Sequence, residues 1–387
     1  MKPFTVLIIG ASGVFGSRLA ARCAREPGVR IILAGRREAA LKALASSIDP
    51  DATIRPLDRD TLIASDLAGA DLVVDAAGPF QSSHDAVIRA AIAARIPTID
   101  LADGRDFVAA IGQYDMAARA AGIAILTGVS TIPAMSHAVV DELVEGWSRI
   151  DALRVGIFPG NRAPRGLSVV QAILSYVGRP VRVWRKGCWH DVPGWGVTHR
   201  WHLSDGTRRW ASVCDTPDQD LLVSRYRPHR SAEFFAGLEL SILHLGLALL
   251  AWPARLRMLS SLRPMARSLL WIAQRFLRWG SDVGYMEVRA DGADAAGTTV
   301  TACWTLRAAG NCGPVVPTLA ALAMIRRIRD GHVPPPGARA CVGELTLAEF
   351  AGDFEELGIA TYITRAPGPD DDGNNPSAIH KNTAILV

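Results

Sequence analysis

The sequence predicts an α/β protein, in which a Rossmann-type doubly wound parallel sheet precedes a second α+β domain built on a mixed sheet. Two observations carry this prediction. Up to about residue 126, short strand-like runs alternate with alanine-rich helical segments, as in βαβ units. From Arg154 onward, strand-like runs follow one another with shorter links, which indicates mixed or antiparallel pairing.

The elements of the first domain are expected as short apolar runs and alanine-rich helices between them. Strands are expected at Thr5–Ile9, Ile31–Ala34, Thr53–Arg55, Asp71–Asp75, Thr98–Ile99 and Ile123–Leu126. Helices are expected at Ala39–Ser47, His84–Ala94 and Tyr114–Ala121. A sheet of this kind binds ligands at the carboxyl ends of its strands, so functional residues are expected there.

The second domain is expected to cover the ligand-binding end of the first. Its strands are expected at Val155–Phe158, Val181–Trp184, Thr198–Leu203, Arg209–Val213, Gly284–Ala290 and Thr299–Arg307, with a helix at Leu167–Tyr176. A further helix at Thr318–Arg329 precedes three prolines, which cannot continue it. The predicted parts are a Rossmann domain (1–130), a substrate and dimerisation domain (131–310), a C-terminal helix and return segment (311–365) and a flexible tail (366–387).

A glycine turn opens the chain and is its most informative motif. The strand-like run Thr5–Ile9 leads into three glycines with the spacing G-x-x-G-x-x-G, and apolar residues then continue at helical spacing. The free N–H groups at such a helix start hold a pyrophosphate. A bare glycine loop is also a common structural turn, but its place after the first strand favours a nucleotide site. The expected cofactor-binding residues here are Gly10, Ser12, Gly13, Val14, Phe15 and Gly16.

The end of the second strand indicates which nucleotide binds. NAD-preferring sites usually carry an acid there for the ribose 2′-hydroxyl, whereas this chain has Ala34 and Gly35 followed by Arg36 and Arg37. The planar guanidinium fork suits a 2′-phosphate. A solvated basic loop is the alternative. The missing acid and the added arginines together predict NADP(H) rather than NAD.

Composition limits the classes of function. The chain has 387 residues, 49% of them hydrophobic and 21% charged, and its net charge of +4 argues against a nucleic-acid partner. Its six cysteines show neither a C-x-x-C pair nor zinc spacing, so no metal site is expected and the thiols are taken to be reduced. The first apolar run is too short for a signal peptide. We therefore expect a cytoplasmic protein.

Several separated motifs resemble the saccharopine dehydrogenase-like oxidoreductases, a family that includes saccharopine reductase and the trans-acting enoyl reductases of lipid biosynthesis. The matching segments are Gly10–Gly16, Asp75–Phe80, Ile99–Gly104, Gly128–Pro133, Gly280–Asp282 and Gly310–Pro314. The resemblance implies an NADP-binding Rossmann domain and a second α/β domain with substrate and dimer contacts, hence a homodimer. It does not imply one substrate. The chain departs from the commoner Tyr-x-Asp-x-x-Gly-Glu element, since Thr98 replaces the tyrosine and the glutamate is absent.

The segment after the fourth strand is expected beside the cofactor. Ala77, Gly78, Pro79 and Phe80 would border the ribose and nicotinamide, with the phenylalanine packing on the ring. A purely structural Gly-Pro turn is the alternative. The Tyr-x-x-x-Lys pair of short-chain dehydrogenases, which share the glycine turn, is absent.

Hydride transfer needs a proton or an electrostatic partner, and three residues are candidates for this catalytic role. His84 starts the helix after Gly-Pro-Phe but equally suits a surface position. Asp100 follows the fifth strand, where aspartates often only cap the next helix. His137 begins a helix that links the domains, and it equally suits a packed interface.

Two further patterns in the second domain have open interpretations. Arg162 and Arg165 precede a helix start and suit an anion pocket, although surface arginines are plentiful. Tryptophans are concentrated in one β-rich stretch, where they suit either an apolar substrate cavity or packing on a sheet face. They are Trp184, Trp189, Trp195, Trp201 and Trp210.

Residues 236–280 form a hydrophobic and basic segment. No acid occurs between Glu239 and Asp282, and Leu240–Ala254 is too short to span a bilayer. Further on, one helix face carries Met265, Leu269, Ile272, Phe276 and Trp279, and the opposite face carries Arg263, Arg267 and Arg278. Such a helix suits a lid over an apolar substrate, a dimer contact or a membrane interface. We favour a lid or dimer helix.

These expectations combine into an NADP(H)-dependent oxidoreductase. It would transfer hydride to or from a C=O, C=N or C=C bond of a hydrophobic small molecule, such as an acyl or isoprenoid-like compound. A catalytically silent NADP-binding sensor, or a scaffold at a membrane surface, is the alternative. The absence of a compelling acid–base group favours the alternative, and the aromatic, arginine-rimmed second domain argues against it.

Overall fold

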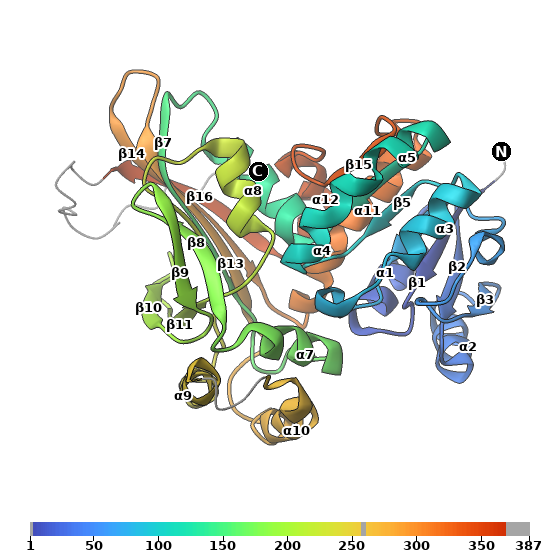
Figure 1. Cartoon of the computed structure of the whole chain (residues 1–387), viewed down its shortest axis with the longest axis horizontal. Helices are drawn as coiled ribbons and strands as arrows, with labels where there is room; N and C mark the ends of the chain where they lie inside the picture. The colour runs from blue at the N-terminus through green and yellow to red at the C-terminus, as the bar shows by residue number, and fades with distance from the viewer. Residues whose placement is uncertain (1–2, 257–260, 369–387) are drawn as a thin grey trace. The chain divides into compact units, whose positions relative to one another are not determined.

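The computed structural model describes residues 3–256 and 261–368, which divide into two compact units (Figure 1). Unit 1 comprises Met1–Met135 and Pro314–Leu345, and unit 2 comprises Ser136–Gly313 and Thr346–Val387, in each case within the described residues. The predicted segment 311–365 is thus divided between the two units. The predicted tail begins inside a strand that runs to Pro367, and residues 369–387 lie outside the described part.

Unit 1 is built on a parallel sheet with the strand order β15-β6-β5-β4-β1-β2-β3. Its strands are β1 (Phe4–Ile9), β2 (Val29–Gly35), β3 (Thr53–Pro56), β4 (Leu72–Asp75), β5 (Thr98–Asp100), β6 (Ala124–Thr127) and β15 (Gly337–Ala340). The run Val6–Ile8 in central β1 is fully buried, as expected for a strand with both faces covered. The predicted strands of the first domain and its Rossmann-type sheet are confirmed.

The helices of unit 1 alternate with these strands. They are α1 (Val14–Cys23), α2 (Glu38–Ile48), α3 (Ala86–Ala94), α4 (Arg105–Ala109), α5 (Asp115–Ala121) and α11 (Val316–Arg329). Helix α11 packs against α1, and strand β15 pairs in parallel with β6. Both elements come from the C-terminal part of the chain, which is why the Rossmann unit extends beyond the predicted 1–130.

Unit 2 is built on a mixed sheet with the order β10-β11-β12-β7-β13-β14-β16, to which β8 and β9 add through β12. The strands are β7 (Arg149–Phe158), β8 (Pro180–Arg185), β9 (Cys188–Pro193), β10 (Thr198–His202), β11 (Arg208–Val213), β12 (Ser231–Ala236), β13 (Gly284–Ala293), β14 (Thr299–Ala308) and β16 (Ala360–Pro367). The β12–β7 pair is parallel, whereas the other strand pairs of this sheet are antiparallel. The predicted mixed sheet is confirmed.

The helices of unit 2 include one that matches its prediction to the residue and two that the sequence did not reveal, α8 and α12. They are α6 (Ser136–Leu143), α7 (Leu167–Tyr176), α8 (Asp218–Tyr226), α9 (Ser241–Arg255), α10 (Ala266–Arg275) and α12 (Ala351–Glu356). Helix α8 has little apolar periodicity, because only Leu222 among its large apolar residues is buried, and α12 has only six residues. Helix α10 ends at Arg275, so Phe276 and Trp279 of the predicted helix face lie beyond it.

Candidate functional site

The glycine turn joins β1 to α1, and the packing of its backbone requires glycine. The Gly13 N–H donates to the Gly10 carbonyl over 2.8 Å, and Gly10 has a positive φ of 76°. A Cβ on Gly16 would lie 2.2 Å from the Gly10 oxygen. Side chains at these positions would therefore push the turn open.

The turn presents the N-terminus of α1 at the carboxyl end of β1. The helix begins at Val14, with Gly13 as its N-cap and no acid in its first turn. The first N–H groups of a helix have no partner within it, and the helix dipole favours a negative charge there. Ser12, Val14 and Phe15 are half-buried around this end, so the cradle fits a pyrophosphate.

Arg36 and Arg37 follow the end of β2, at the same edge of the sheet. Both are exposed, and neither side chain forms a hydrogen bond or ion pair with another described residue. The nearby Glu38 instead pairs with Lys42, at 2.7 Å between Oε1 and Nζ. The two guanidiniums are thus available for an anion, as a 2′-phosphate site requires.

The end of β4 is held against the glycine turn. A Cβ on Gly10 would lie 2.9 Å from atoms of Ala77, and the Ala76 N–H donates to the Ile9 carbonyl. The Asp75 carboxylate fixes the segment, because it accepts hydrogen bonds from the Ala77 N–H at 3.0 Å and from Arg59 Nε at 2.7 Å. Ala77 therefore lies directly against the glycine turn.

Arg59 is a site residue that the sequence did not reveal. Its side chain is nearly buried, its Nη2 lies 2.6 Å from Asp75, and its guanidinium lies 5.3 Å from the centre of the Phe80 ring. Burial raises the pKa of Asp75, and the Arg59 charge opposes that rise. An aspartate that ends a buried strand signals the need for a cation, but nothing in the sequence indicates which one.

Phe80 lies in the core of unit 1 and not on an exposed surface. Its ring is 5% exposed and packs against Phe107, with ring centres 5.3 Å apart. Gly104 packs against the backbone of Phe80, because a Cβ on Gly104 would lie 2.9 Å from the Phe80 carbonyl carbon. The ring therefore supports the Gly78–Pro79 turn from the core side.

Asp100 ends β5, beside Asp75 on the neighbouring β4. One of its oxygens accepts hydrogen bonds from the Thr127 hydroxyl, the Gly128 N–H and the Ala102 N–H, at 2.8 to 2.9 Å. Burial raises the pKa of this carboxyl to about 7, although these hydrogen bonds oppose the rise. Asp100 therefore both fixes the turn after β6 and holds a proton near neutral pH.

The two histidine candidates lie in different surroundings and in different units. His84 is exposed on unit 1, between the Phe80 turn and α3. His137 is fully buried in unit 2, where its Nε2 lies 3.8 Å from Oδ1 of the equally buried Asp218. Burial lowers the pKa of His137 to about 3 and raises that of Asp218 to about 7. The His137 ring is thus neutral and is a poor proton donor.

Three glycine-containing loops meet in unit 2. Glu239 joins two of them, because its carboxylate accepts hydrogen bonds from the Asn161 N–H at 2.6 Å and from the Ser281 N–H at 2.9 Å. Asp282 joins the third by accepting from the Asn311 N–H at 2.9 Å. These loops follow β7, precede β13 and follow β14, so they share one end of the mixed sheet.

The arginines and tryptophans singled out in the second domain lie in different surroundings. Arg165 donates to the backbone and side-chain oxygens of Asn161, whereas Arg162 is exposed. Trp195 and Trp201 are buried, and Trp201 packs on the sheet against Phe158 and Phe235. Trp201 also borders a cavity of about 320 Å³ whose lining is mainly basic: Arg154, His199, Arg200, His202, Glu233, Phe235 and Arg289.

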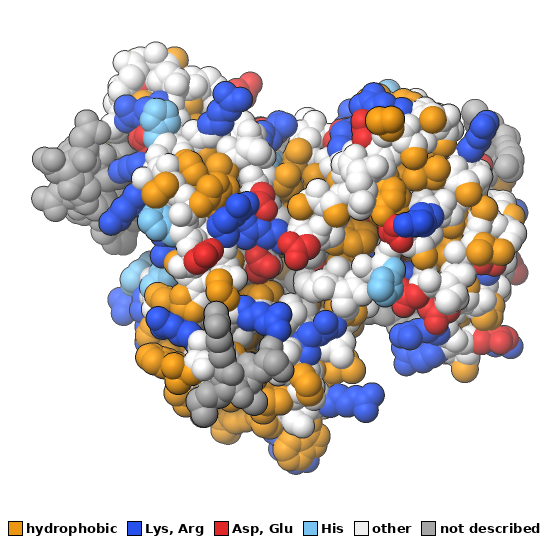
Figure 2. Space-filling model, viewed as in Figure 1, with side chains coloured by type: hydrophobic (Ala, Val, Ile, Leu, Met, Phe, Trp, Pro, Cys, Tyr) orange, Lys and Arg blue, Asp and Glu red, His pale blue; other side chains and the backbone are white. Residues whose placement is uncertain are grey.

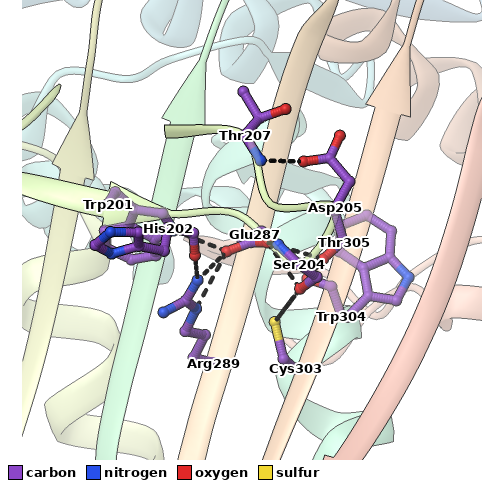
Figure 3. A network of polar contacts seen from close by, with 10 residues as sticks. All are labelled: Trp201, His202, Ser204, Asp205, Thr207, Glu287, Arg289, Cys303, Trp304 and Thr305. Atoms are coloured by element: carbon purple, nitrogen blue, oxygen red, sulfur yellow. Dashed lines mark hydrogen bonds and ion pairs between the residues drawn. The ribbon is translucent and has the colours of Figure 1, made fainter. Parts of the chain in front are cut away.

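A buried carboxylate organises the middle of the unit 2 sheet (Figure 3). Glu287 on β13 is fully buried and accepts hydrogen bonds from Trp201 Nε1 at 2.7 Å and from the Ser204 N–H at 2.7 Å. It also accepts from the Thr305 hydroxyl at 3.0 Å and pairs with Arg289 at 2.6 Å. This network ties the β10–β11 turn to β13 and β14, and it was not expected from the sequence.

Comparison with known proteins identifies the nucleotide-binding domain at the start of the chain. Residues 6–126 match the saccharopine dehydrogenase NADP binding domain, over the segment that holds the glycine turn and the arginine pair. This part of the chain is thus a saccharopine dehydrogenase-like NADP-binding domain. The match supports an oxidoreductase with an NADP(H) cofactor, as the sequence motifs predicted.

Solved structures support the fold over the whole described chain. Apo saccharopine dehydrogenase (L-Glu forming) from Saccharomyces cerevisiae is similar with a TM-score of 0.68 and 15% identity, covering 94% of this chain and 99% of that one. Homospermidine synthase from Legionella pneumophila, in complex with NAD, gives a TM-score of 0.65 and 10% identity, covering 100% and 97%. No protein of curated function matches the sequence. At these identities the likeness is one of fold.

Proposed function

We propose that this saccharopine dehydrogenase-like protein transfers hydride between NADP(H) and a C=O, C=N or polarised C=C bond of a hydrophobic small molecule. One observation carries the cofactor half of the proposal. A glycine cradle at the end of β1 lies at the same sheet edge as two unpaired arginines after β2, where an NAD site would carry an acid. NADPH, when bound, supplies the hydride; the protein binds and orients it.

The proposed contacts follow the cofactor along the sheet edge. The backbone of Gly10, Ser12, Gly13, Val14, Phe15 and Gly16 surrounds the pyrophosphate, because side chains are excluded there by packing. Arg36 and Arg37 bind the 2′-phosphate through charge-assisted hydrogen bonds. The backbone of Ala77, Gly78 and Pro79 borders the nicotinamide end, and Phe80 holds that turn in place from the core side.

Among the three proton-donor candidates, we propose Asp100 as the group that holds the proton. Hydride transfer leaves negative charge on the acceptor, which a group protonated near neutral pH can neutralise. The raised pKa of Asp100 and its place next to the β4 end support this role. His84 has no buried contact that would orient it, and the neutral ring of His137 does not suit donation.

Cofactor preference tests the proposal directly. We expect native mass spectrometry and calorimetry to detect NADPH binding and weaker NADH binding, and the same spectra report the subunit count of the proposed homodimer and any co-purified apolar ligand. An Arg36→Ala/Arg37→Ala variant should lose about tenfold to hundredfold in NADPH affinity, since hydrogen bonds to charged groups contribute about 1.5–3 kcal/mol. Its NADH affinity should not change.

The matched control is Arg25→Ala, which removes an exposed arginine elsewhere on unit 1 and should leave both affinities unchanged. Equal affinity of the wild-type protein for NADPH and NADH would contradict the role of the arginine pair. A protein that binds NADPH tightly but reduces no carbonyl, imine or enoyl acceptor would instead be a catalytically silent sensor.

A further inference from the structure

The outer face of α9 is a continuous stripe of exposed apolar side chains. Its members recur at intervals of three and four residues, which places them on one side of the helix. Their exposed fractions lie between 40% and 69% for Ile242, Leu245, Leu249, Trp252 and Leu256. Soluble proteins rarely expose a contiguous group of large apolar side chains, so the stripe indicates a binding surface.

The fold itself uses the opposite face of α9. His244 is fully buried there, with its Nε2 at 3.1 Å from the Ser212 hydroxyl and its Nδ1 accepting the Leu238 N–H at 3.2 Å. Ala251, one helix turn before the C-terminus, is also buried and packs over Gly178. The helix is thus anchored to unit 2 without its outer stripe, which leaves that stripe free for a partner.

Helix α10 and the residues just after it add a second apolar area. The exposed members are Met265, Trp271, Ile272, Leu277 and Trp279. The residues Leu269 and Phe276, also expected on the apolar helix face, are half-buried, and α10 packs on α7. Trp271 and Ile272 border a shallow hollow of about 450 Å³ together with Arg267 and Ser268. In Figure 2, hydrophobic and basic side chains gather in the lower part of unit 2, where α9 and α10 lie.

The charge on this surface has a single sign. No aspartate or glutamate occurs from residue 240 to residue 281. Four exposed arginines of this stretch form no ion pair with a described residue, namely Arg255, Arg267, Arg275 and Arg278. Two of them lie over tryptophan rings, with Arg255 at 5.6 Å from the Trp252 centre and Arg275 at 4.3 Å from the Trp271 centre.

We propose that the outer face of α9 and α10 binds the surface of an anionic lipid membrane. Arginines meet the headgroup phosphates, and the leucine and tryptophan side chains enter the boundary with the acyl chains. A second copy of this chain is the less suitable occupant, because a self-complementary contact would oppose arginines to arginines with no acid between them. Within the described residues, no helix has the length and apolar character to cross a bilayer, so the helices lie along the surface.

The test measures flotation of the full-length protein with phosphatidylcholine vesicles, and with vesicles of phosphatidylcholine and phosphatidylglycerol. We expect binding only to the anionic vesicles, and less of it at high salt. An Arg267→Glu/Arg278→Glu variant should bind at least about tenfold less, as should Leu249→Ser/Trp252→Ser. The matched controls are Arg25→Glu/Arg208→Glu and Met116→Ser, which change exposed residues outside this surface and should bind as the wild type does.

Each other outcome counts against the proposal. It is overturned if the wild-type protein floats with neither vesicle, or if the variants and controls bind equally well. Sedimentation of the same proteins without lipid identifies the alternative, since a dimer that dissociates in Leu249→Ser/Trp252→Ser would assign the surface to a second copy. Thermal unfolding at the wild-type temperature shows that each variant is folded. Flotation needs no NADPH, which keeps this test independent of the proposed reaction.

Discussion

Replacing Gly16 by alanine perturbs the glycine turn at the point where the structure leaves least room. The new Cβ would lie 2.2 Å from the Gly10 oxygen and 2.8 Å from its carbonyl carbon, whereas nonbonded contacts of this kind require more than 3 Å. Both clashing atoms belong to the backbone, and the same oxygen accepts the Gly13 N–H. The turn must therefore move by close to an ångström, or α1 must shift away from β1.

The cost has two measurable parts. Overpacking of this severity destabilises by up to about 3 kcal/mol. In a unit of this size that lowers Tm by roughly 2 to 12 °C. A displaced turn also no longer aims its N–H groups at the pyrophosphate, so NADPH affinity should fall by at least about tenfold, or ~1.4 kcal/mol. Calorimetry measures both quantities, by thermal unfolding and by titration with NADPH.

Gly112→Ala is the matched control, because a Cβ there meets no atom within 4 Å and the residue has no positive φ. We expect this variant to keep its NADPH affinity and to be as stable as the wild type or slightly more so. The reasoning is refuted if Gly16→Ala unfolds at the wild-type temperature and binds NADPH normally. Loss of binding in both variants would also refute it, since the effect would then not depend on the turn.

Two further predictions concern buried carboxylates, one in each unit. Glu287→Ala removes the acceptor of the unit 2 network and leaves its donors buried, so the free energy of unfolding of unit 2 should fall by about 3–5 kcal/mol in chemical unfolding. The control Glu145→Ala, at an exposed residue, should change it by almost nothing. A fall below about 1 kcal/mol in Glu287→Ala would contradict the role of the network. For Asp100, burial raises the pKa from 3.8 to about 7, so its contribution to folding stability is fully present below the unfolded pKa and is lost as the pH rises through about 7. The free energy of unfolding of Asp100→Asn, relative to wild type, should therefore increase between about pH 4 and about pH 8, by up to about 4 kcal/mol. Asp51→Asn on the surface should show no such trend, and parallel pH curves for Asp100→Asn and wild type would show that the carboxyl titrates normally.

Local patterns predicted the parts of the protein that depend on neighbouring residues. Strands β1 to β6 and helices α2, α3 and α5 of the Rossmann unit follow from hydrophobic periodicity and from the glycine and proline residues that end the elements. The same holds for the helix Leu167–Tyr176 and the mixed second sheet. The nucleotide turn follows from its glycine spacing. The four-residue strand β15 was missed because it has no hydrophobic run, and its partner β6 lies more than 200 residues away.

Which distant residues meet was decided by the tertiary structure alone. The pairing of Arg59 with Asp75 and the joining of two loops by Glu239 depend on loop paths that no local pattern encodes. Burial likewise decided the character of side chains that sequence could only propose: it placed Phe80 in the core and made His137 neutral. Sequence thus determined the elements and the cofactor turn, because hydrogen bonding and periodicity act over a few residues. The assembled fold determined pKa values, ion pairs and exposed surfaces, because desolvation and charge act between atoms that are neighbours only in space.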